Sequence, residues 1–123
     1  MQLKGLNEIC SEIHAANVAK GFYVQEPIID RSLMLIIGEV SEAHEALRKD
    51  LFASLEKFND PAMDNFFKTN FEQNIKNTFE DEIADTIIRL FDFCGFHGID
   101  IETFIELKLK YNETRPYKHG KKF

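Results

Sequence analysis

Two segments of this chain combine the apolar periodicity of a helix with a pair of carboxylates three residues apart. Glu39 and Glu42 lie in one of them, IIGEVSEAHEAL, and Glu82 and Asp85 lie in the other, FEDEIADTIIRLFDF. Positions three or four residues apart share one face of an α-helix. Each pair is therefore predicted to occupy one helix face, inside the two most apolar parts of the chain.

Helix signals also dominate the rest of the sequence, and no segment alternates convincingly as a β-strand would, so the predicted class is all-α. Four main helices are expected, at about residues 8–20, 31–49, 79–96 and 101–112. The expected N-terminal caps are Asn7, Asp30 or Ser32, Thr78 with Asp81, and Asp100, and Gly21 is expected just after the first helix.

The apolar faces of two of these helices lead to two further expectations. The first turns of the second helix, Leu33–Ile37, are apolar on every side, which predicts that this end is buried. In the third helix, the stripe that holds Glu82 and Asp85 is expected largely opposite the main apolar face of Ile83, Ile87, Leu90 and Cys94.

The length of 123 residues suggests a single domain spanning 1–123. Residues 50–77 scatter phenylalanines among Asn, Asp and Lys, and we expect helical pieces there, packed on the main body or on another subunit. Asp60-Pro61 reads as a cap followed by the first residue of a short helix. The basic tail, residues 114–123, should be extended.

Charge and hydropathy limit the class of partner and the location. The formal net charge is −6 although the residues from Lys108 onward are basic, and an acidic body does not suit a nucleic-acid polymer. No apolar run reaches the ~18 residues of a membrane span, and MQLKGLNEIC lacks the pattern of a signal peptide. We therefore expect a cytoplasmic protein in which Cys10 and Cys94 are buried, reduced thiols.

The acidic pairs have two readings. Carboxylates near a helix N-terminus favour the helix dipole, so the pairs can be ordinary solvated surface. Alternatively, two helices that face each other with carboxylates at i and i+3 can hold a hard cation. A di-iron site of the Glu-x-x-His type is disfavoured, because no Asp or Glu lies three residues before any of the four histidines. An oxygen-only set favours Mg²⁺ or Mn²⁺.

Three stretches of the chain, GEVSEAHEALRKD, EDEIADTIIRL and KLKYNETRPYKHGKKF, resemble the MazG-like all-α nucleoside triphosphate pyrophosphohydrolases, a superfamily that includes dimeric dUTPases. The family's E-x-x-E and E-x-x-D pairs match Glu39, Glu42, Glu82 and Asp85. Its closing motif matches Lys108, Asn112, Arg115, Pro116, His119, Gly120 and Lys121. Residues 50–77 depart from the family pattern as an insertion, which either alters oligomerisation or covers the site.

The resemblance implies a four-helix-bundle-type fold and Mg²⁺-dependent cleavage of a nucleoside triphosphate between its α- and β-phosphates, giving monophosphate and pyrophosphate. Glu39 or Glu42 would then orient or deprotonate the attacking water. Candidate substrate-binding residues are Lys108, Asn112, Arg115, Lys118, His119 and Lys121 for the phosphates and sugar, and His14, Asn17 and Phe22, with Tyr23, for the base.

Assembly and two alternative functions complete the expectations. A chain of this size cannot bury its acidic stripes, apolar faces and phenylalanines alone, which predicts a homodimer or a dimer of dimers whose bundle is completed by oligomerisation. One alternative is a non-catalytic helical bundle that binds a nucleotide or a protein partner. The other is a metal-dependent phosphatase that releases orthophosphate.

Overall fold

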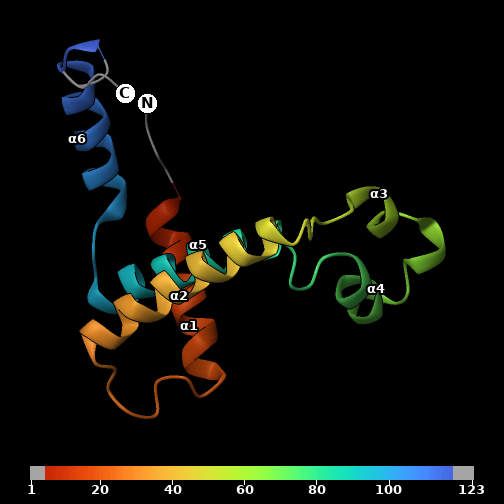
Figure 1. The fold of residues 1–123 in the computed structure, drawn as a ribbon. Helices are drawn as coiled ribbons and strands as arrows, with labels where there is room; N and C mark the ends of the chain where they lie inside the picture. Colours follow the sequence, from red (N-terminus) through yellow and green to blue (C-terminus); the bar gives the residue numbers. More distant parts are fainter. Residues whose placement is uncertain (1–4, 118–123) are drawn as a thin grey trace. The chain divides into compact units, whose positions relative to one another are not determined.

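A computed structural model describes residues 5–117, and within that range the chain forms helices and no β-strand. The helices are α1 (Leu6–Ala19), α2 (Ile29–Arg48), α3 (Leu55–Phe58), the 3₁₀-helix η1 (Pro61–Met63), α4 (Phe67–Asn74), α5 (Phe79–His97) and α6 (Ile101–Glu113) (Figure 1). The prediction of an all-α chain is confirmed. The predicted tail residues Lys118, His119 and Lys121 lie outside the described range.

The chain divides into two compact units. The first combines the residues up to Gln25 with those from Phe91 onward, and the second spans Glu26–Leu90. The first unit holds α1, α6 and the C-terminal end of α5. The second holds α2, the short helices of the predicted insertion, and most of α5. No composition shift or linker in the sequence indicates this division.

In the first unit, Asn7 joins α1 to α6. Its side-chain amide donates to Asp100 Oδ1 at 2.8 Å, and its backbone N–H donates to Glu102 Oε1 at 3.0 Å. The backbone N–H of Glu102 donates back to Asn7 Oδ1 at 3.2 Å. Asn7 was predicted to cap its own helix, and this is wrong: the N-cap of α1 is Gly5, and Asn7 serves the start of α6 instead.

Close helix approach in the same unit depends on Gly95. A Cβ atom at this position would lie 2.5 Å from the backbone oxygen of Cys10, so only glycine lets α5 approach α1 there. Cys10 and Cys94 are buried and unpaired by a disulfide, as expected of reduced thiols. Burial raises the pKa of both thiols, which keeps them protonated and unreactive.

In the second unit, the insertion is closed at its base by backbone hydrogen bonds. Phe79 N–H donates to the Leu51 carbonyl at 2.8 Å, and Ser54 N–H donates to the Asn74 carbonyl at 3.1 Å. The segment between these residues forms α3, η1 and α4, which confirms the expectation of helical pieces. The Asp60 side chain caps η1 by accepting from Ala62 N–H, as the Asp-Pro pair predicts.

The caps predicted for the other helices are confirmed only in part. Asp100 caps α6 by accepting from Thr103 N–H, and Gly21 follows α1 with a positive φ of 87°, both as expected. The start of α2 differs, because its N-cap is Ile28 with no side-chain hydrogen bond. Ser32 is already inside the helix, where its hydroxyl donates to the Ile28 carbonyl.

The burial of the two acidic helices differs from the prediction. The first turns of α2 were expected to be buried, but only Ile36 is, and Met34 is 61% exposed. On α5, Glu82 is buried, whereas three residues of the main apolar face are exposed and only Cys94 of that face is buried; the exposed ones are Ile83, Ile87 and Leu90. The reason is that nothing in the described chain covers these apolar faces. None of the helices within residues 5–117 is long and apolar enough to cross a bilayer.

Gly95→Ala tests the close approach of α5 to α1. We expect it to lower the free energy of unfolding by about 1–3 kcal/mol, as overpacking of a tight contact does. Gly38→Ala in α2 is the matched control, because a Cβ there meets nothing within 4 Å. The control should be neutral or stabilising by up to about 1 kcal/mol. Urea unfolding measures both, and equal stability of the two variants would contradict the proposed contact.

Candidate functional site

The carboxylates of α2 and α5 meet in the second unit. One oxygen from each of Glu39, Glu42 and Glu82 lies within 4.8 Å of the others, and the same holds for Asp81, Glu82 and Asp85. The i, i+3 spacing places Glu39 with Glu42 on one face of α2 and Glu82 with Asp85 on one face of α5. Glu82 belongs to both groups. The two groups, five carboxylates in all, are called the acidic cluster below.

Glu82 is the buried centre of the acidic cluster. It is 6% exposed, and within residues 5–117 no hydrogen-bond donor reaches its Oε2 atom. Burial, followed by the hydrogen bond and the negative charge of Glu42, raises the pKa of Glu82 to about 7. A buried polar atom without a partner is costly, so this oxygen is an open position for a proton or a cation.

The rim of the acidic cluster is held by other contacts. Arg89 Nε donates to Glu39 Oε1 at 2.7 Å, which fixes one carboxylate of α2. Asp81 accepts from the backbone N–H of Asn77 at 2.9 Å, just before α5 begins. The pKa of Asp85 is raised by burial and by the charges of Asp81 and Glu39, while Arg89 opposes the rise.

Two members of this arrangement are not among the predicted site residues. Asp81 was predicted only as part of a helix cap, although it stands four residues before Asp85 and so shares its face. Arg89 was given no role, although the same i, i+4 spacing from Asp85 places it on that helix face.

Two of the predicted phosphate-binding residues, Lys108 of α6 and Arg115 just after it, lie near one aromatic ring in the first unit. The Lys108 ammonium lies 5.2 Å from the centre of the Tyr111 ring, and the Arg115 guanidinium lies 5.9 Å from it. Asn112 Oδ1 is buried without a hydrogen-bond partner in the described part of the chain. Lys108 and Arg115 therefore place two positive charges near the same ring.

The predicted base-binding residues also lie in the first unit, where Asp92 organises two of them. His14 Nδ1 lies 3.0 Å from Asp92 Oδ1, and the Tyr23 hydroxyl donates to Asp92 Oδ2 at 2.6 Å. Burial and this hydrogen bond raise the pKa of Tyr23 well above its usual range. Phe96 stacks on the Tyr23 ring at 5.1 Å between centroids. His14 and Tyr23 are thus tied to the fold, and sequence reasoning gave Asp92 no role.

Asn17 and Phe22 take no part in that network. The backbone N–H of Phe22 donates to the Asn17 carbonyl at 3.1 Å, which turns the chain after α1. The Phe22 side chain is 73% exposed, so it is available to a ligand and is not core.

The chain matches no known protein-family model, no curated protein and no solved structure at a significant level.

The raised pKa of Glu82 predicts how stability depends on pH in the absence of divalent cations. Between about pH 4.5 and pH 7 the folded protein holds a proton that the unfolded chain has released, so stability falls as pH rises through that window. Glu82→Gln removes the titration and should lessen the fall by about 2 kcal/mol. Urea unfolding in EDTA at pH 5 and pH 7.5 measures both proteins.

Glu45→Gln, on the exposed part of α2, is the matched control for this measurement. It should lose stability over the window as the wild-type protein does. A Glu82→Gln variant with the full wild-type pH dependence would mean that Glu82 is not the buried proton-binding group.

Proposed function

We propose that this chain is a Mg²⁺-dependent nucleoside triphosphate pyrophosphohydrolase of the MazG-like type, acting on the nucleotide pool of the cytoplasm. It would cleave the α–β phosphate bond to give a nucleoside monophosphate and pyrophosphate. The observation that carries the proposal is the buried carboxylate of Glu82, whose Oε2 atom has no hydrogen-bond partner among residues 5–117 and which belongs to both carboxylate groups.

The acidic cluster fits the proposed ion. Its ligand atoms are carboxylate oxygens from five side chains, which is the ligand type that Mg²⁺ and Mn²⁺ favour. The pKa of about 7 for Glu82 means that a proton occupies this position over much of the acidic range. A divalent cation would replace that proton and offset the repulsion among carboxylates that otherwise lie too close together.

The chain's own residues have distinct roles in the proposed reaction. When bound, Mg²⁺ would neutralise charge on the phosphate oxygens and make water easier to deprotonate. Glu39 is already paired with Arg89, whereas Glu42 is exposed and forms no ion pair among residues 5–117. We therefore assign Glu42 the orientation and deprotonation of the attacking water. Glu82, Asp81 and Asp85 would hold the ion.

The residues around Tyr111 are proposed to bind phosphate. The guanidinium of Arg115 offers two parallel donors to a phosphate, and Lys108 adds a second positive charge on the same ring. Asn112 Oδ1 is an open acceptor that suits a sugar hydroxyl. Lys118, His119 and Lys121 lie outside the described residues, and the resemblance alone proposes them as substrate-binding residues.

Two other functions remain distinguishable from this proposal. A non-catalytic bundle would bind a nucleotide or protein without turnover. A phosphatase would release orthophosphate in place of pyrophosphate.

Product analysis tests the proposed reaction. The purified protein with Mg²⁺ and each common ribo- and deoxyribonucleoside triphosphate should yield monophosphate and pyrophosphate in equal amounts. Glu42→Gln should lower kcat at least about 100-fold, as loss of a general base does. Glu45→Gln, three residues after Glu42 on the same helix and outside the cluster, should retain wild-type kcat. Orthophosphate as the first product, or full activity in Glu42→Gln, would contradict the assignment.

We also propose that the protein works as a homodimer or a dimer of dimers. The exposed apolar side chains of α2 and α5 support this, among them Met34, Ile37, Val40, Ile83, Ile87 and Leu90. Exposed apolar faces of this extent are typical of association surfaces. Light scattering at micromolar concentration should give two or four times the chain mass of 14.3 kDa. A monomeric mass would show that these faces stay uncovered.

A further inference from the structure

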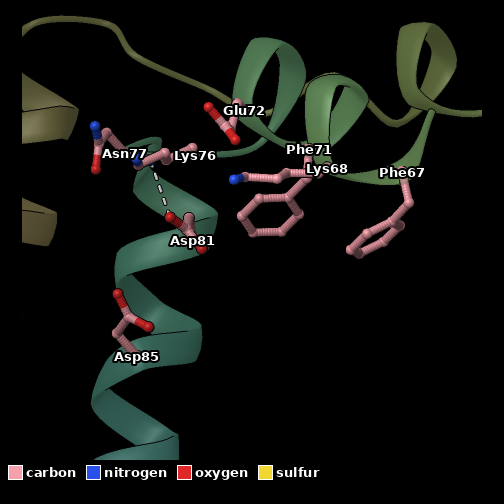
Figure 2. Close-up of a pocket in the computed structure, with 8 residues that line it drawn as sticks. All are labelled: Phe67, Lys68, Phe71, Glu72, Lys76, Asn77, Asp81 and Asp85. Atoms are coloured by element: carbon pink, nitrogen blue, oxygen red, sulfur yellow. Dashed lines mark hydrogen bonds between the residues drawn. The ribbon is translucent and has the colours of Figure 1, made fainter.

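The second unit contains a cavity of about 420 Å³ between the insertion and the start of α5. It is lined by side chains from α4, from the turn that follows it and from the first turns of α5: Phe67, Lys68, Phe71, Glu72, Lys76, Asn77, Asp81 and Asp85 (Figure 2). A volume of this size is within the range of small-molecule sites. The sequence analysis gave residues 50–77 no ligand.

The cavity shares an edge with the acidic cluster. Asp81 and Asp85 line it, and the same two residues form one cation-binding group with Glu82. In Figure 2 both carboxylates lie along α5, on the side of the cavity away from Phe67. A cation held by this group would therefore lie at one end of the cavity, with α4 beyond it.

Two lysines of the cavity are free to bind an anion. Neither Lys68 nor Lys76 forms an ion pair among residues 5–117, and Figure 2 shows the Lys68 ammonium directed from α4 toward α5. Two lysines and three carboxylates line the cavity. Once a divalent cation neutralises Asp81 and Asp85, the positive charges are in excess, which favours a polyphosphate.

The far side of the cavity is aromatic. The ring centroids of Phe67 and Phe71 are 6.0 Å apart, and Phe67 meets Phe58 edge-on at 6.1 Å. Phe67 is nevertheless 68% exposed, which is unusual for a residue inside an aromatic group. A nucleotide carries phosphates at one end and a base at the other. The lysines and carboxylates at one end of the cavity would suit the phosphates with their cation, and the aromatic surface at the other end would suit the base.

We propose that the α4 cavity is the nucleotide-selecting site of this protein, with Lys68 and Lys76 on the β- and γ-phosphates and Phe71 stacked on the base. This inference rests on the proposed function, because Lys68, Lys76 and Phe71 would bind the substrate of that same acidic cluster. The insertion is then a specificity element that contributes side chains to substrate binding.

Calorimetric binding tests the lysines without requiring turnover. The probes are an α,β-methylene nucleoside triphosphate and inorganic tripolyphosphate, each with Mg²⁺. Lys68→Ala should weaken both about tenfold, as loss of one charge-assisted contact does. Lys57→Ala, on the neighbouring α3 and outside the cavity lining, is the matched control and should bind both as the wild-type protein does. Equal affinities for Lys68→Ala and Lys57→Ala would overturn the proposal.

Phe71→Leu separates base from phosphate and keeps an apolar side chain at a half-buried position. It should weaken the nucleotide analogue about tenfold through lost stacking and leave tripolyphosphate unchanged. Loss of both ligands to the same degree, or of neither, would overturn the stacking role. Circular dichroism on each variant confirms that the helices remain.

The outcomes also separate this proposal from the proposed function. Hydrolysis with Lys68→Ala and Phe71→Leu indistinguishable from the wild-type protein would leave the reaction standing and place the substrate elsewhere. Lysine-dependent binding without hydrolysis would support the cavity and refute the reaction. A wild-type protein that binds neither probe would refute both.

Discussion

The buried carboxylate of Glu82 is the constraint on which the second unit depends. A carboxylate taken out of water loses its hydration, and four other acidic side chains surround this one. The fold offsets only part of that free-energy cost. A pKa of about 7 favours a proton on Glu82, and Arg89 pairs with Glu39 at the edge of the cluster. The part of the cost that the fold leaves uncompensated is the basis on which we propose a cation there.

Placing the acidic faces of α2 and α5 toward each other has a second consequence. Their apolar side chains then point away from the cluster and stay exposed in the single chain, as Ile87 does at 46%. The same arrangement that gathers the ligands thus creates the surface for which we propose a second copy. The insertion contributes in a similar way, because its base is closed by hydrogen bonds to the end of α2 and the start of α5, which brings α4 to the edge of the cluster.

Local patterns predicted the helices and the acidic cluster, and longer-range packing accounts for what they missed. Periodicity located the helices. The i, i+3 spacing paired Glu39 with Glu42 and Glu82 with Asp85, because it determines which side chains share one face of a helix. The cap at Asn7 was missed because its partners, Asp100 and Glu102, are more than ninety residues away. The predicted burial of the first turns of α2 was wrong, because periodicity shows which residues are apolar but not what covers them. The α4 cavity could not be predicted, since Lys68 and Asp85 line it together only because of the path of the chain between them, which no local pattern sets.

A Mg²⁺ titration of the protein by calorimetry at pH 8 tests the central claim most directly, because it requires neither the substrate nor the assembly. The account predicts saturable binding by the wild-type protein, an affinity at least about tenfold lower in Glu82→Gln, and unchanged affinity in Glu45→Gln. Equal affinity in Glu82→Gln and the wild-type protein would contradict it, since the buried carboxylate would then hold no ion.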